Sequence, residues 1–271
     1  MDTFRVPAVL SIAGSDSSGG AGIQADIKTI AAHGLFAETA ITALTAQNTT
    51  GVRDVLEATP EFVGEQIDAV FEDIPPAAVK IGMVSSAAII ETIAQRLERW
   101  QAANIVVDPV MVATSGARLI NEYASTALTG RLLPLARVIT PNIPEATALA
   151  GRPISDADEQ QAAACELAER FGCAVLVKGG HGVADANDVL AEPMGTVEPR
   201  ITWFTHERIE TENTHGTGCT LSSAIACGLA RGLTLSDAVE QAKAYLTGAL
   251  AAGLDLGRGS GPVDHMWRHR G

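Results

Sequence analysis

The residues best suited to chemistry form one run, Asn-Thr-His-Gly-Thr-Gly-Cys-Thr, at positions 213–220. An apolar, alanine-rich run follows at 221–229, and its composition predicts a buried helix. Gly216 and Gly218 let the backbone turn tightly and approach a ligand, because neither carries a Cβ. The first N–H groups of a helix have no partners within it, and together with the helix dipole they attract an anion. The run therefore predicts an anion-binding helix start that includes Thr217.

Cys219 falls in the first turn of that predicted helix. There the pKa of a thiol is expected to drop, which makes the thiolate more available as a base or nucleophile. The competing interpretation is a glycine-rich turn that caps a core helix, with Cys219 as a small buried hydrophobic residue. The run by itself does not decide between the two.

Three further candidates stand where apolar segments end. Gln47 begins the turn expected after the segment 40–46 and offers an amide donor and acceptor together, which suits a ring nitrogen beside an exocyclic amine. A surface glutamine in a turn is the alternative. Met83 ends the segment 78–83 and can pack on a ring ligand or simply fill the core. Asp108 ends a buried strand, where ligands bind in open α/β sheets, although an Asp before a proline also forms turns.

Three more polar residues follow the later strands. Asn142 and Glu145 lie three positions apart, so both can face one side of a helix start. Lys178 ends the apolar segment 174–177 and is followed by two glycines. A lysine there is a suitable point charge for nucleotide phosphates, and a surface lysine is the alternative.

A glycine-rich loop, residues 14–22, joins an apolar strand to a helix near the N-terminus. It lacks the G-x-G-x-x-G spacing, and no G-x-x-x-x-G-K-[ST] loop occurs in the chain. Gly14 is therefore expected to let a small ligand lie against the backbone. Asp26 sits one turn into the helix, where a favourable interaction with the helix N-terminus is the alternative to a ligand contact.

The elements that must position these residues alternate along the chain. Apolar strands are expected at 8–13, 40–46, 52–58, 78–83, 104–107, 137–140, 174–177, 188–190 and 200–205. Helices are expected after residue 22, after 142, and at 60–71, 86–101, 155–171, 221–229 and 236–250. Ser155 is the expected N-cap of its helix. This β–α alternation predicts a mainly parallel sheet covered on both faces, with the candidate residues at one edge.

Length and composition fit a single domain over residues 1–271, since 271 residues at 46% hydrophobic suffice for one large α/β domain. The net charge of −13 and the absence of a basic run argue against nucleic acid and anionic membranes as partners. The four cysteines form neither a C-x-x-C pair nor a zinc spacing, which is typical of a reduced, cytoplasmic chain. The apolar run at 7–14 is too short for a membrane span.

The run at 213–220 resembles the anion-hole signature of the ribokinase-like kinases. Cysteine at 219, where sugar kinases of that group have Asp, resembles the hydroxymethylpyrimidine/phosphomethylpyrimidine kinases of thiamin biosynthesis. The pattern at 12–26, the Ala-Gln-Asn-Thr at 46–49, and Asn-x-x-Glu at 142–145 are similar to the same family. So is the ending Gly-x-Gly-Pro-Val-x-His at 259–265, whose role the sequence does not indicate.

The resemblance implies a single-domain ribokinase-like three-layer α/β fold and a homodimer. It implies an ATP- and Mg²⁺-dependent kinase that phosphorylates 4-amino-5-hydroxymethyl-2-methylpyrimidine and then its monophosphate. The site residues it implies are Gly216, Thr217, Gly218 and Cys219 for catalysis; Gln47, Gly14, Asp26, Met83 and Val110 for substrate; Lys178, Asn142 and Thr214 for ATP; and Asp108 and Glu145 for Mg²⁺, which prefers oxygen ligands.

Three rival functions stay open at this point. Pyridoxal kinase is an enzyme of the same fold, and its relatives with this cysteine use a second cysteine in a flap. The corresponding flap at 112–117 contains none and has Ala113 in the middle. A transferase could use Cys219 covalently with His215 as base. A regulatory protein could bind nucleotide without turnover.

Overall fold

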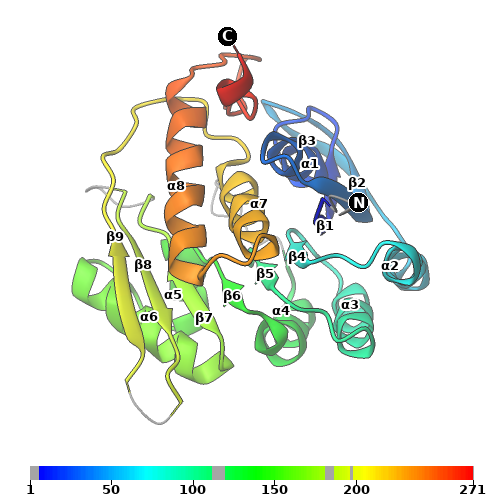
Figure 1. Ribbon diagram of the computed structural model, residues 1–271, viewed down its shortest axis with the longest axis horizontal. Coiled ribbons are helices and arrows are strands. Elements are labelled where there is room, and N and C mark those ends of the chain that lie inside the picture. The colour runs from blue at the N-terminus through cyan, green and yellow to red at the C-terminus, as the bar shows by residue number, and fades with distance from the viewer. Residues whose placement is uncertain (1–5, 112–119, 181–185, 196–197, 271) are drawn as a thin grey trace, which may run out of the picture.

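The computed structural model describes residues 6–111, 120–180, 186–195 and 198–270. Its centre is one nine-stranded sheet with the order β3-β2-β1-β4-β5-β6-β7-β8-β9 (Figure 1). The strands are β1 Ala8–Asp16, β2 Phe36–Asn48, β3 Gly51–Glu57, β4 Ala78–Ile81, β5 Ile105–Val107, β6 Val138–Ile139, β7 Ala174–Val177, β8 Asp188–Glu192 and β9 Arg200–Phe204.

Six neighbouring strands run parallel: β2, β1, β4, β5, β6 and β7. At the two sides of the sheet, β3 pairs antiparallel with β2, β8 with β7, and β9 with β8. Every residue of β4, β5, β6 and β7 is buried, which explains why these short strands are apolar apart from Lys80 in β4. The predicted mainly parallel sheet is confirmed.

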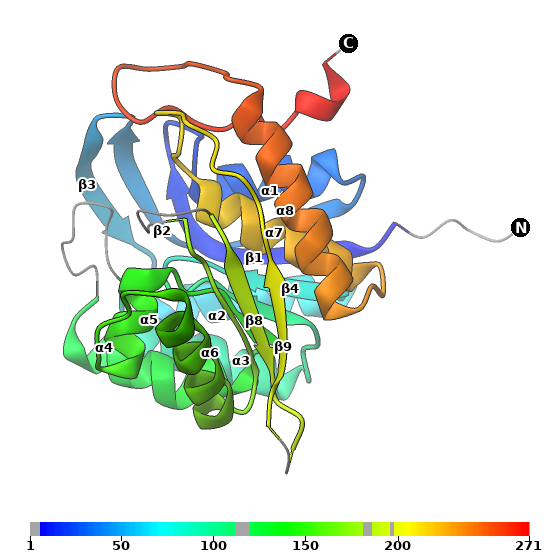
Figure 2. The same ribbon diagram turned by 90° about the vertical axis from the view of Figure 1, so that its left-hand side faces the viewer.

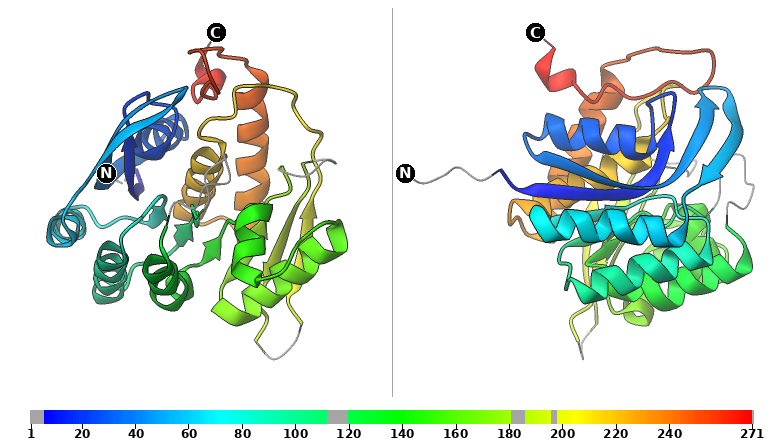
Figure 3. Two further views of the ribbon diagram at one scale, coloured as in Figure 1. Left: turned by 180° about the vertical axis from the view of Figure 1, so that it is seen from behind. Right: turned by 90° about the vertical axis from the view of Figure 1, so that its right-hand side faces the viewer.

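The helices form a layer on each face of the sheet, as Figures 2 and 3 show. Helices α1, α7 and α8 cover one face, and α2 to α6 cover the other (Figure 1). The helices are α1 Gly22–Ala32, α2 Pro60–Asp73, α3 Ala87–Arg99, α4 Glu122–Ala127, α5 Ile143–Ala150, α6 Ala157–Phe171, α7 Thr217–Ala230 and α8 Leu235–Ala251. Short π and 3-10 turns follow at η1 Leu128–Leu132, η2 Leu133–Leu135 and η3 Trp267–His269. The predicted three-layer arrangement is confirmed.

Several predicted boundaries were wrong. Gln47 lies at the end of β2 and pairs with Val52 of β3, where the sequence suggested a turn. The N-cap of α6 is Asp156, whose carboxylate accepts from the N–H of Glu159, whereas Ser155 donates to the Glu159 carboxylate. The Asp156 carboxylate accepts from that N3 amide at 2.8 Å, whereas the Ser155 hydroxyl is engaged by the Glu159 side chain.

The carboxyl ends of the parallel strands and the starts of α1, α5 and α7 lie at the same edge of the sheet (Figure 2). The expected flap at 112–117 lies outside the described residues. Within the described ranges, no helix is long and apolar enough to span a membrane.

Candidate active site

The start of α7 has the backbone geometry predicted for an anion-binding site. Its N-cap, Gly216, has a φ of 81°, and a Cβ there would lie 1.9 Å from the carbonyl oxygen of Gly20. Only glycine fits this left-handed and crowded position. Among the described residues nothing accepts from the N–H groups of Gly218 and Cys219. The predicted helix start is therefore present with free donors.

An acid and a lysine lie directly against this helix start. A Cβ on Gly218 would be 3.0 Å from Asp108 Oδ2 and 3.5 Å from Lys178 Nζ. Lys178 Nζ donates to Asp108 Oδ1 at 2.9 Å, and Thr140 Oγ1 donates to the same oxygen at 3.0 Å. Burial alone would raise the pKa of Asp108, but the nearby ammonium groups and these hydrogen bonds hold it below its ordinary value.

Asn142 and Glu145 cap α5 reciprocally. Asn142 Oδ1 accepts from the N–H of Glu145 at 2.9 Å, and Glu145 Oε2 accepts from the N–H of Asn142 at 2.8 Å. The two side chains share one side of the helix start, as predicted. Asn142 also bridges to the backbone of Lys178. Burial raises the pKa of Glu145 to about 7, although the Lys178 ammonium opposes that rise.

The expectation for the thiol of Cys219 was wrong. Burial raises its pKa, and this outweighs the lowering effect of the Lys80 ammonium and of a hydrogen bond from the Gly22 backbone. The negative charges of Asp26 and Asp108 add to the rise. A helix N-terminus alone therefore does not set the thiol's ionisation, because dehydration disfavours the thiolate.

The residues predicted to hold a ring lie around the ends of β1, β2 and β4. A Cβ on Gly14 would be 3.0 Å from Met83 Cε, so these two residues are brought together. Gln47 is half-buried, and its Oε1 accepts from Thr45 Oγ1 at 3.2 Å. Its backbone is fixed by two hydrogen bonds of 2.8 Å with Ser17 Oγ. The half-buried Val110 follows β5, two residues beyond Asp108.

Asp26 lies in the protein interior and binds protein groups, which argues against the predicted ligand contact. Its side chain is 0% exposed, and its two oxygens accept from Lys80, Ser11 and Ser223 at 2.6–2.9 Å. These donors saturate the carboxylate within the protein interior. Sequence reasoning missed Lys80, a single charged residue in the apolar run Ala-Val-Lys-Ile that could have signalled a buried pair.

Sequence reasoning also missed Asp16, which ties the glycine-rich loop to the anion hole. Its carboxylate accepts from the backbone of Ser18, Gly20 and Ala21 and lies 2.8 Å from His215 Nε2. Burial opposes ionisation, but these donors hold the pKa of Asp16 well below its ordinary value. The signal was an Asp directly followed by Ser-Ser-Gly-Gly, which is typical of a side-chain-to-backbone turn. Thr214, next to His215, is exposed, with its hydroxyl 3.1 Å from Ser260 Oγ.

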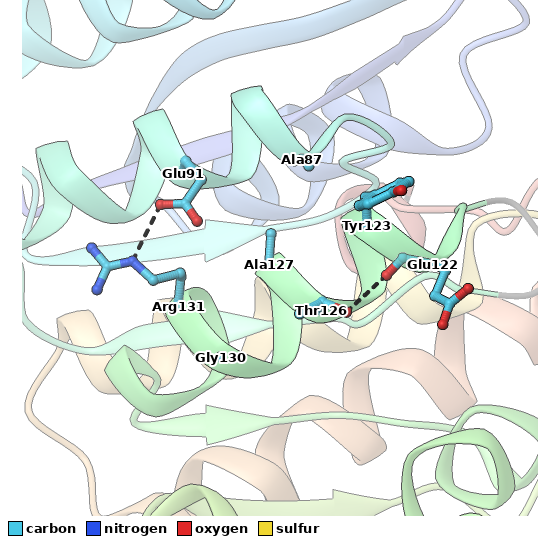
Figure 4. A pocket seen from close by; sticks show the side chains of 8 residues that line it. All are labelled: Ala87, Glu91, Glu122, Tyr123, Thr126, Ala127, Gly130 and Arg131. Atoms are coloured by element: carbon cyan, nitrogen blue, oxygen red, sulfur yellow. Dashed lines mark hydrogen bonds and ion pairs between the residues drawn. The ribbon is translucent and has the colours of Figure 1, made fainter.

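A surface depression of about 660 Å³ lies elsewhere, between α3 and α4 (Figure 4). Arg131 pairs with Glu91 across it, and the exposed Tyr123 lies at one end. None of the predicted site residues lines it. The predicted site residues therefore lie at the sheet edge, away from this depression.

Comparison with known proteins agrees with the geometry. The model of the family described as "Phosphomethylpyrimidine kinase" matches residues 16–264. The hydroxymethylpyrimidine/phosphomethylpyrimidine kinase of Rhizobium meliloti is 51% identical over 263 residues, 96% of this chain and 97% of the relative. A thiamine biosynthesis bifunctional protein of Geobacter sulfurreducens is 49% identical over 97% of this chain. This chain spans about half, 53%, of that longer relative.

Solved structures show the same fold. A phosphomethylpyrimidine kinase from Clostridium difficile aligns with a TM-score of 0.79 and 43% identity, covering 90% of this chain and 98% of that one. A pyridoxal kinase from Bacillus subtilis, solved as an ADP complex, aligns with a TM-score of 0.89 and 33% identity, covering 98% of this chain and 99% of that one. The fold is thus shared with a phosphomethylpyrimidine kinase and with a pyridoxal kinase.

Proposed function

The chain belongs to the phosphomethylpyrimidine kinase family, and from this premise we propose that it is a kinase of thiamin biosynthesis. It transfers phosphate from ATP to 4-amino-5-hydroxymethyl-2-methylpyrimidine and then to the resulting monophosphate. One observation carries the proposal: the free N–H groups at the start of α7 lie against the Asp108–Lys178 pair. Donors, cation and acid meet at one point, as phosphoryl transfer requires.

The chain's own groups act mainly by binding and orientation. The transition state of phosphoryl transfer is loose, with charge spread over the phosphoryl oxygens. The N–H groups from Gly216 to Cys219 stabilise that charge, and the Lys178 ammonium neutralises another phosphate oxygen. Asn142 and Thr214 complete the phosphate side in this proposal.

Cys219 is the proposed acceptor of the proton from the attacking hydroxyl group. Because burial raises the pKa of this thiol, the protonated form is favoured at neutral pH. The Lys80 ammonium and the helix start are the groups that favour ionisation. Base catalysis is therefore expected to contribute less than positioning.

The Asp108 and Glu145 carboxylates fit Mg²⁺. Asp108 Oδ2 has no hydrogen-bond partner among the described residues and faces the helix start, while Oδ1 is held by Lys178. Within those residues no group of three or more metal-binding side chains occurs. That suits a cation held by one or two carboxylates, water and substrate phosphate. When bound, Mg²⁺ would neutralise charge on the nucleotide phosphates.

A second, smaller cavity is proposed to take the nucleotide base. It measures about 80 Å³ and lies between the start of β8, the loop after β9 and helices α7 and α8. His206 lines it, and its buried Nδ1 has no partner among the described residues. Asp188, also in the lining, binds Lys243 at 2.7 Å and the N–H of Gly179 at 2.9 Å. The cavity is thereby joined to the strand end that carries Lys178.

Gln47 is proposed to select the aminopyrimidine over pyridoxal. A side-chain amide can accept from the exocyclic amine while it donates to the adjacent ring nitrogen. Among the described residues only Thr45 engages its side chain, so the amide nitrogen is free to donate. Pyridoxal has no such amine–nitrogen pair and would leave the amide partly unpaired. An unpaired buried group costs about 1–3 kcal/mol of binding free energy.

The test is a coupled ADP-release assay with the pyrimidine alcohol, pyridoxal and pyridoxine. The wild type is expected to prefer the pyrimidine by at least about tenfold in kcat/KM, roughly 1.4 kcal/mol. Gln47→Leu should erase that preference while ATP binding persists, and Gln161→Leu on α6 is the matched control. Equal or better use of pyridoxal by the wild type would assign the protein to pyridoxal kinase instead.

The exposed β2–β3 hairpin supports the proposed homodimer. All seven residues of β3 are exposed, and Leu44 and Leu56 form a cross-strand pair with 49% and 69% of their surface accessible. An apolar pair exposed on a hairpin marks an interaction surface. Light scattering on the purified protein measures the stoichiometry, and a monomer at micromolar concentration would contradict the proposal. The cytoplasmic location stays a prediction.

A further inference from the structure

The segment after α8 lies against the start of α7, at the upper end of the molecule in Figure 1. The N–H of His215 donates to the carbonyl of Gly261 at 3.0 Å. A Cβ on Gly261 would lie 2.0 Å from Asn213 Oδ1, so the backbone of this segment lies directly against the Asn213 side chain. This contact gives the Gly-Pro-Val-x-His ending a place beside the anion hole.

The same segment holds the end of β2. Thr49 Oγ1 accepts from the N–H groups of Arg258 and Gly259 at 3.2 and 3.3 Å. A Cβ on Gly259 would be 2.1 Å from the carbonyl oxygen of Thr49. Since Thr49 lies two residues beyond Gln47, the segment joins the proposed ring-binding strand to the anion hole.

His265 connects this segment to the helix start through one hydroxyl. Thr220 Oγ1 donates to the carbonyl of Gly216 at 2.8 Å and lies 3.1 Å from His265 Nε2. A hydroxyl has one proton, and a carbonyl can only accept, so Nε2 must be the donor to Thr220. Burial, with help from the Lys28 charge, lowers the pKa of His265 to about 4. The ring is therefore neutral at pH 7, with its proton on Nε2.

This chain of hydrogen bonds ends on the N-cap of α7. The Gly216 carbonyl accepts from both the hydroxyl and the N–H of Thr220, at 2.8 and 2.9 Å. A peptide unit is planar, so fixing that carbonyl also fixes the direction of the Thr217 N–H in the same unit, which here donates to the carbonyl of Thr214 at 3.3 Å. Glycine at 216 has no side chain that would otherwise restrict the rotation of this unit.

We propose that His265 is a positioning residue for the anion hole, acting through Thr220 on the Gly216–Thr217 peptide. It is not a catalytic residue, because it touches neither substrate nor phosphate. His265 itself is held in place by the Tyr245 hydroxyl, which donates to its carbonyl at 2.5 Å. The inference rests on the proposed kinase function, since the hydrogen-bond chain matters to turnover only if the helix start binds the transferring phosphoryl group.

The first test is the isosteric Thr220→Val, compared with Thr220→Ser in the ADP-release assay. We expect kcat to fall by about tenfold to a hundredfold in the Val variant, less than the 10²–10³ that follows loss of a whole donor. KM for ATP and for the alcohol should stay within about threefold, because the change is in orientation rather than in ground-state contacts. The Ser variant keeps the hydroxyl and should retain kcat.

The second test separates positioning from stability. His265→Gln keeps an N–H donor near the Nε2 position and should recover most of the kcat that His265→Ala loses. Thr129→Val removes a comparable hydroxyl-to-carbonyl bond to Ser125 on α4, away from the site, and should retain kcat. Amide exchange of residues 216–220 should be faster in Thr220→Val, with the melting temperature little changed.

Two results would overturn the inference: wild-type kcat in Thr220→Val, or unchanged exchange at 216–220 in that variant. Failure of His265→Gln to improve on His265→Ala would also count against it. If the wild type phosphorylates none of the alcohols, the proposed function fails, and the exchange measurement still decides whether the hydrogen-bond chain holds the helix start.

Discussion

Lys80 and Lys178 each pair with an aspartate beside α7, at 2.8 and 2.9 Å, but the two pairs differ in what remains for a ligand. Lys80 and Asp26 are both 0% exposed, and serine hydroxyls from β1 and α7 also bind the carboxylate. Lys178 and Asp108 keep 14% and 5% of their side-chain surface, and Asp108 Oδ2 is left facing Gly218.

The two ion pairs therefore have different roles, one structural and one available to a ligand. The closed pair joins β1, β4, α1 and α7, so its contribution is to fix those elements and to supply a positive charge beneath Cys219. In the open pair, Asp108 Oδ2 has no hydrogen-bond partner among the described residues. Lys178 and Asp108 can therefore bind a phosphate and a cation at the sheet edge. Sequence distance does not distinguish them, since the pairs join residues 54 and 70 positions apart.

The largest expected effect is on stability, from Lys80→Met. The variant leaves the Asp26 carboxylate buried without its cation, which typically costs about 3–5 kcal/mol of unfolding free energy. Urea denaturation measures it, with Lys178→Met as the matched variant at the open pair. Because water can reach that pair, its loss of stability should be clearly smaller, and equal losses would show that the two pairs do not differ as described.

The next effect is on activity, from Lys178→Ala. Loss of one charge-stabilising donor in a transition state costs about 10²–10³ in kcat, or roughly 2.7–4 kcal/mol. The ADP-release assay at low ATP measures it, and the melting temperature should change little. Arg152→Ala, a surface cation paired with Glu166, is the control for net charge. A Lys178→Ala enzyme that turns over normally would remove Lys178 from the phosphate site.

The smallest effect concerns Glu38, a buried carboxylate on β2 whose Oε2 has no hydrogen-bond partner among the described residues. Burial raises the pKa of Glu38 to about 7 from the ordinary 4.5. Between these values the folded state holds the proton that the unfolded state has released. Unfolding free energy therefore falls as pH rises from about 4.5 to 7 and levels off above.

Glu38→Gln should remove this decline. The stability of the variant relative to wild type should rise by about 1–3 kcal/mol between pH 4 and pH 8, since one unit of pKa shift corresponds to about 1.4 kcal/mol. Denaturation curves at both pH values measure it, and Glu72→Gln on the exposed side of α2 is the control. A difference that does not change with pH would mean that Glu38 is ionised at neutral pH in the fold.

Local patterns in the sequence correctly predicted the parts of this protein that depend on near neighbours. The apolar runs became the buried parallel strands, Asn142 and Glu145 became a reciprocal cap, and Gly216 took the left-handed turn at the start of α7. Each depends on residues within about one turn of helix, which the chain itself specifies. The family motifs added the kinase function, which the comparisons support.

Only the tertiary structure decided which charged side chains are fully buried and which remain accessible to a ligand. Sequence patterns predicted a ligand contact for Asp26 and a lowered pKa for the Cys219 thiol. In the fold, Asp26 is buried against Lys80, and burial raises the pKa of the Cys219 thiol. It also gave the His265 segment its place beside Thr220. These outcomes depend on dehydration and on charges brought together from distant parts of the chain, and both are set by packing rather than by residue type or spacing.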